Sequence, residues 1–192
     1  MRRPSTVLAV LVVVFELAGL GRAEPFVLFP KAGELRSPNG RYVVRNAERS
    51  AAATEFVGIA HSLWLIEVAN HRSRKLCDYL GVAAVAWSGN EYVVMTEYVA
   101  KKTSRALVFP VDDFAEASVL DKPTLLRVLP AESRDTLEQS DHVFVEASRL
   151  EDGILFLHVW GYGPRDRNGF RWSCSYELRG GRVTCPGNRN SP

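Results

Sequence analysis

Histidine is the side chain best suited to acid–base or metal chemistry near neutral pH. The sequence contains four of them, and no two have the short spacing of a known zinc site. They are His61, His71, His142 and His158. His158 lies inside an apolar run, where a hydrogen-bonded strand residue is the simpler interpretation. A hydrolase that uses His142 or His158 with a carboxylate therefore stays open only as a minor alternative.

Other signatures of catalysis are missing from the sequence. It has no Gly-x-Ser-x-Gly nucleophile elbow, no phosphate-binding glycine loop and no paired cysteine–histidine motif. Asp112 and Asp113 offer carboxylates, but adjacent side chains at a strand end point to opposite sides. We therefore predict no catalytic residue, no metal ligand and no cofactor.

Two groups of side chains are suited to binding. Four tryptophans would suit a platform that stacks on sugars, although core or hairpin packing is the commoner role of this residue. They are Trp64, Trp87, Trp160 and Trp172. The loop at 161–167 is the second candidate, and its predicted partner-binding residues are Tyr162, Arg165 and Arg167. The loop opens an arginine-rich end of the chain, whereas residues 111–152 are acidic; the two segments either face each other, cover separate surfaces or form a basic face for an anionic envelope component.

Three cysteines fit an oxidising compartment. A two-residue turn at Arg179 and Gly180 sets Cys174 opposite Cys185, so these two are the predicted disulfide, with pairings that use Cys77 as the alternatives. A turn shifted by one residue would place Tyr176 opposite Cys185 instead. Cys77 is then left unpaired, and we interpret it as a small packed side chain rather than a nucleophile.

Residues 1–23 have the pattern of a secretory signal. Arg2 and Arg3 precede the apolar run 7–15, and Ala23 supplies the small residue at the cleavage site. The apolar run is too short to span a bilayer, so we expect no stable membrane anchor after cleavage. Removing this segment takes away three arginines and one glutamate, so the 24 basic and 22 acidic residues become 21 of each. A formally neutral mature chain argues against nucleic acid as a partner.

Alternating apolar residues predict a mainly β fold with about eight to ten strands in antiparallel sheets. The expected strands are 41–46, 62–68, 83–87, 91–98, 106–111, 142–149, 153–161 and 170–178. Asp121 precedes Pro123 and a leucine-rich stretch, and Pro130 follows, which predicts one or two short helices within 122–139. The segment 47–60 suits either a helix or a long loop. Residues 24–192 are expected to form a single domain.

The turn Ser37-Pro38-Asn39-Gly40 and the strand after it are echoed by Ser88-Gly89-Asn90-Glu91 and, more weakly, by Glu151-Asp152-Gly153. With His61–Ile66 and Ala86–Ser88, these turns resemble the blades of secreted β-propellers and small uncharacterised exported bacterial proteins with blade-like repeats. The resemblance covers about 35–111 and, more loosely, 153–178; it departs from the pattern at Gly89 and Glu91. It implies blade-like hairpins and no catalytic group. A closed propeller needs at least four blades of about 40 residues each, so an open assembly is expected, with a small or incomplete propeller as the alternative.

These observations favour an exported noncatalytic protein, periplasmic or secreted, that binds a protein or another component of the cell envelope. An inhibitor of a secreted enzyme is the first alternative, because a small β domain with one disulfide can present a rigid loop. A hydrolase is the second.

Overall fold

The computed structural model describes residues 25–48, 60–100, 102–111, 116–164 and 169–185. The expected signal segment and most of the ambiguous stretch 47–60 lie outside these ranges.

Most of the described chain is in antiparallel strands of two sheets, which confirms the mainly β prediction. The larger sheet contains β1 (Val27–Phe29), β6 (Ala83–Ser88), β7 (Tyr92–Ala100), β8 (Thr103–Pro110), β9 (Ser118–Leu120), β10 (His142–Glu151), β11 (Ile154–Tyr162), β12 (Phe170–Glu177) and β13 (Val183–Thr184). The smaller sheet contains β2 (Glu34–Arg36), β3 (Tyr42–Glu48), β4 (Ala60–Glu67) and β5 (Ser73–Leu80).

All eight expected strands are present, but the described residues contain thirteen strands rather than eight to ten. Four of the additional strands, β1, β2, β9 and β13, have only two or three residues, too few to display an alternating pattern. The fifth, β5, is an edge strand whose exposed Lys75 and half-buried Asp78 interrupt its apolar residues. Charged residues are common on edge strands because they discourage pairing with other chains.

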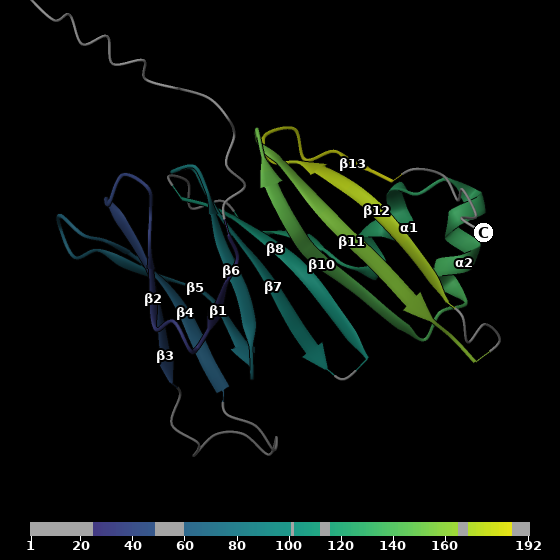
Figure 1. The fold of residues 1–192 in the computed structure, drawn as a ribbon, viewed down its shortest axis with the longest axis horizontal. Coiled ribbons are helices and arrows are strands. Elements are labelled where there is room, and N and C mark those ends of the chain that lie inside the picture. Colours follow the sequence, from purple (N-terminus) through teal and green to yellow (C-terminus); the bar gives the residue numbers. More distant parts are fainter. Residues whose placement is uncertain (1–24, 49–59, 101, 112–115, 165–168, 186–192) are drawn as a thin grey trace, which may run out of the picture.

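In chain order, strands β2–β5, β6–β9 and β10–β13 form three successive antiparallel meanders. Figure 1 shows the blue strands of the first meander at one side, the teal strands of the second in the middle and the green to yellow strands of the third at the other side. Two hydrophobic cores separate these layers.

The middle meander is buried on both faces. In β7, Val93 and Met95 belong to the first core, which lies between the first and second meanders and also contains Leu63 and Leu65 of the small sheet. Val94, between them in sequence, belongs to the second core, which lies between the second and third meanders. This two-sided burial explains why β6, β7 and β8 have nearly continuous apolar sequences, which are typical of strands with no solvent-facing side.

Two short helices close the second core, as the sequence predicts. Helix α1 (Lys122–Val128) begins after Asp121, whose side chain accepts a hydrogen bond from the backbone N–H of Thr124 at 2.9 Å. Helix α2 (Ala131–Glu138) follows Pro130 directly. Both helices direct leucines into the core next to β10–β12, namely Leu125 and Leu137.

Cys174 and Cys185 are joined in the terminal hairpin, with their sulfur atoms 2.04 Å apart. Ser175 pairs with Thr184 and Tyr176 with Val183, so the register is the one predicted for a turn at Arg179 and Gly180. The alternative register, which would place Tyr176 opposite Cys185, is excluded. This covalent link holds β13 on β12, where the strand itself has only two residues.

The second and third meanders meet where β10 leaves the edge of β8. The two strands run parallel there, and the backbone pairing is confined to Val143 and Thr103. Beyond that point two hydroxyl side chains replace the backbone partners. The Oγ of Ser104 accepts from the N–H of Val145 at 3.0 Å and donates to its carbonyl at 3.3 Å. The Oγ1 of Thr96 on β7 accepts from the N–H of Ala147 at 2.9 Å. We call these contacts the hydroxyl seam.

Ser104→Ala should destabilise the fold by about 1–3 kcal/mol, because it leaves a buried backbone N–H without its acceptor. Urea unfolding followed by tryptophan fluorescence measures the change. Ser148→Ala is the matched control, since its hydroxyl also bonds a backbone carbonyl but is exposed, and it should change stability by less than about 0.5 kcal/mol. Equal losses of stability for Ser104→Ala and Ser148→Ala would show that the hydroxyl seam stabilises the fold no more than an exposed hydrogen bond does.

Candidate functional site

Alternation along three strands creates an outward surface on the last meander. Val143, Val145, Leu157 and Val159 lie in the core, so their sequence neighbours on β10 and β11 project the opposite way. We call this surface the outer face. Its residues are His142, Phe144 and Glu146 of β10, Phe156, His158, Trp160 and Tyr162 of β11, and Arg171, Ser173 and Ser175 of β12.

The outer face carries an aromatic wall of two stacked pairs. Phe144 and Trp160 are cross-strand partners whose ring centroids lie 4.0 Å apart, with 14° between the planes. His142 and Tyr162 stack in the same way, at 4.3 Å and 9°. Trp160 and Tyr162 are neighbours along β11, with centroids 6.5 Å apart. One face of the Trp160 ring and one face of the Tyr162 ring are thus covered from the β10 side.

Glu146 fixes the orientation of the Trp160 indole. One carboxylate oxygen accepts from the indole N–H of Trp160 at 3.2 Å, and the other accepts from the hydroxyl of Tyr98 on β7 at 3.1 Å. Partial burial and the charge of Glu146 raise the pKa of Tyr98, so its hydroxyl keeps its proton and remains a donor. Trp160 is therefore held by a stacked ring and by a hydrogen bond before any ligand arrives.

A hollow of about 440 Å³ lies beside the indole. We call it the indole hollow; it is lined by Glu146, His158, Val159, Trp160, Arg171, Trp172 and Ser173. Its volume is within the range of small-ligand sites, although it is open to solvent.

Three residues of this hollow have the types found in a hydrolytic triad. Ser173, His158 and Glu146 lie in register on neighbouring strands. No hydrogen bond links His158 to either partner in the part of the chain that the structure describes, where the hydrogen-bond partners of Glu146 are Tyr98 and Trp160. The row thus lacks the relay in which a base activates a nucleophile.

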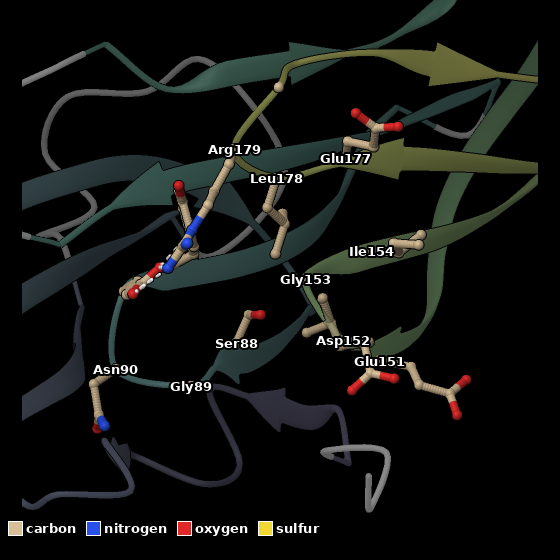
Figure 2. A pocket seen from close by; sticks show the side chains of 14 residues that line it. Ser88, Gly89, Asn90, Glu151, Asp152, Gly153, Ile154, Glu177, Leu178 and Arg179 are labelled. Atoms are coloured by element: carbon tan, nitrogen blue, oxygen red, sulfur yellow. Dashed lines mark hydrogen bonds and ion pairs between the residues drawn. The ribbon is translucent and has the colours of Figure 1, made fainter.

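A second hollow, of about 840 Å³, lies where three turns converge (Figure 2). We call it the turn hollow; it is formed by residues 88–92, 150–154 and 177–180. Figure 2 shows Arg179 reaching across to the β6–β7 turn. Its guanidinium pairs with both oxygens of Glu91, at 2.8 and 2.9 Å.

Two other carboxylates of the turn hollow also have local partners. Glu177 lies 3.6 Å from Arg182, and Glu151 lies 3.3 Å from Arg149. Exposed ion pairs of this kind contribute little to stability, so the turn hollow is best described as a junction between turns. The acidic and arginine-rich segments do not pair with each other through any of these contacts.

The three echoed turns of the sequence occupy equivalent positions. Each one joins the first and second strands of its meander, namely β2–β3, β6–β7 and β10–β11. The backbone N–H of Asn39 in the first turn donates to the side chain of Asn90 in the second at 2.9 Å. The second and third turns both line the turn hollow.

The predicted partner-binding loop is only partly described. Tyr162 is 39% exposed and belongs to the aromatic wall, whereas Arg165 and Arg167 fall outside the described residues, as do Asp112 and Asp113. Arg171 is a basic residue that the prediction did not select, and it stands beside the indole hollow.

The four tryptophans do not form one platform. Trp87 and Trp172 are buried in separate cores, while Trp64 and Trp160 are half-buried on strands of different sheets. The packing role therefore holds for two of them. Trp160 and Trp172 both line the indole hollow, whereas Trp64 and Trp87 line neither hollow.

The histidines are also dispersed. His61 is buried against Tyr79, with ring centroids 5.2 Å apart, and His71 occupies an exposed turn. Among the described residues, no three histidine, cysteine or acidic side chains are grouped so that they could hold a metal ion. No helix within the described ranges is long and apolar enough to cross a membrane.

Sequence reasoning missed Phe144, Glu146 and Tyr98 as parts of a site. Phe144 and Glu146 had a usable signal, since they alternate with the apolar residues of a predicted strand. Tyr98 had none, because it reaches Glu146 only through the contact between β7 and β10.

Comparisons with protein-family models, with curated proteins and with solved structures gave no match for this chain. The properties of its sites therefore rest on its own geometry.

Cys77 is a free thiol on the edge strand β5, half-buried, with its sulfur 3.4 Å from that of Met95. Burial first, and the nearby charge of Glu97 second, raise the pKa of the Cys77 thiol to about 12. These properties fit the packed side chain that the sequence predicts better than a nucleophile.

At pH 8, Cys77 should react with iodoacetamide about 30-fold more slowly in the native protein than in urea. The raised pKa reduces the thiolate fraction about 1000-fold, and the greater intrinsic reactivity of a more basic thiolate recovers part of that loss. Mass spectrometry of timed samples gives both rates. Similar rates in the two states would mean that Cys77 is accessible and reactive.

Proposed function

We propose that this chain is an exported, noncatalytic binding protein that attaches to a component of the cell envelope through the outer face of β10–β12. One observation carries the proposal: Trp160 is fixed between Phe144 and Glu146 beside an open hollow. A rigid aromatic side chain loses little conformational entropy on binding, which makes it an effective anchor.

Export is part of the proposal. It is supported by the secretory pattern of residues 1–23 and by the disulfide between Cys174 and Cys185, a bond that persists mainly in oxidising compartments. The blade-like interpretation is supported by the three echoed turns, which occupy the same place in three successive meanders. In such an assembly the outer face belongs to the last layer.

Binding is favoured over hydrolysis because, among the described residues, no hydrogen bond joins Ser173, His158 and Glu146 into a relay. Binding through the outer face is also favoured over enzyme inhibition by the 161–167 loop. Tyr162, the predicted loop residue that the structure describes, stacks on His142 and extends the aromatic wall.

Trp160→Ala should reduce co-sedimentation of the mature protein with a washed envelope fraction by at least about tenfold, because truncating a central aromatic anchor typically costs more than 1.4 kcal/mol. Trp64→Ala, a substitution of the half-buried tryptophan on the other sheet, should bind like the wild type. Thermal unfolding of each variant verifies that it is folded.

If folded Trp160→Ala binds as well as the wild type, or if Trp64→Ala loses as much, the outer face is not the binding surface. An activity of the wild type on esters, peptides or glycosides that His158→Ala abolishes would instead favour the hydrolase.

A further inference from the structure

We infer that the ligand of the outer face is a polysaccharide built of pyranose sugars, an inference that rests on the proposed function and names its ligand class. The indole of Trp160 would stack on the apolar face of one sugar ring. The polar side chains around the indole hollow would bind its hydroxyl groups.

The available face of Trp160 is determined by its neighbours. Trp160 pairs with Phe144 on β10 and with Arg171 on β12, and the Phe144 ring covers the β10 side. The opposite side of the indole faces β12, where the indole hollow lies. The sugar ring would therefore lie in this hollow, against the indole face that Phe144 leaves uncovered.

Such a ligand would meet an electron-rich indole face. The C–H groups on one side of a pyranose ring are apolar and slightly positive, so they complement the negative face of an aromatic ring. The ring is already fixed, so little conformational freedom is lost when the sugar stacks.

The rim of the hollow offers both donors and acceptors. Glu146 uses one lone pair on each oxygen for Trp160 and Tyr98, and each oxygen has capacity for one more bond. Arg171 has no ion-pair partner among the described residues and offers several N–H donors, while His158 and Ser173 are exposed beside it. Sugar hydroxyls both donate and accept, so they match this mixture.

The same rim argues against other classes of ligand. A protein partner is usually anchored in a dry, apolar pocket, whereas this hollow is bordered by exposed polar side chains. A phosphate-rich ligand needs several cations, but the hollow has a single arginine and a carboxylate.

The aromatic wall extends beyond one sugar. Tyr162 follows Trp160 on the same face of β11, is 39% exposed and is backed by His142. The planes of the two rings differ by 21°, so both present a surface on the same side. An oligosaccharide should therefore bind better than its monosaccharide.

The test is a titration of the mature protein with chitotetraose, cellotetraose and tetragalacturonate, and with the corresponding monosaccharides, followed by calorimetry. We expect at least one tetramer to bind, at least about fivefold more tightly than its monomer. Trp160→Ala should abolish that binding, Arg171→Gln should weaken it, and Tyr162→Ala should remove the advantage of the tetramer. Trp64→Ala should bind the tetramer as the wild type does. The number of sugar reducing ends should stay constant during incubation with the protein, because a noncatalytic protein cleaves no glycosidic bond.

A second arm separates this inference from the proposed function. Cell-wall sacculi purified with hot detergent and protease contain no protein partner, and we expect them to sediment the wild type but not Trp160→Ala. If only the untreated envelope fraction captures the protein through Trp160 and no tetramer binds, the proposed function stands and the polysaccharide assignment is wrong. If protease treatment of the envelope abolishes capture, the partner is a protein and the assignment is again wrong. If neither envelope nor sugars bind, both proposals fail.

Discussion

The hydroxyl seam between β10 and the second meander is the contact on which the rest of the structure depends. The hydroxyl groups of Ser104 and Thr96 accept hydrogen bonds from the backbone N–H groups of Val145 and Ala147, respectively. These two residues flank Glu146. A buried N–H without a partner is costly, so these bonds fix the position of β10 where it leaves β8. They also place Glu146 within reach of Tyr98.

This constraint links the layered fold to the candidate site. Both faces of the middle meander are packed against hydrophobic cores. One face of the last meander packs against the core that it shares with α1 and α2. The outer face lies on the other side of β10–β12. Because Glu146 is held from β7, the orientation of Trp160 depends on the packing between meanders as well as on its own strand.

Local patterns explain why much of the fold was predictable. The main strands alternate, Asp121 and the prolines delimit the helices, and the disulfide joins residues within one hairpin, whose register depends on a nearby turn. The candidate site was less predictable because its contacts are not local. Trp160 is oriented by Phe144 across a hairpin and by Glu146, which is itself held by Tyr98 from a distant strand. No motif in the sequence encodes the parallel contact between β8 and β10.

The most direct test of this account is a nitrogen–proton NMR spectrum that resolves the indole N–H groups of the four tryptophans. Substitution of each tryptophan in turn assigns the four signals. We predict that soluble glycan strands released from purified cell walls shift the Trp160 signal in a saturable manner and leave those of Trp64 and Trp87, which line neither hollow, in place. A shift confined to Trp64, or an unchanged spectrum at an excess of glycan, would contradict a glycan-binding role for the outer face.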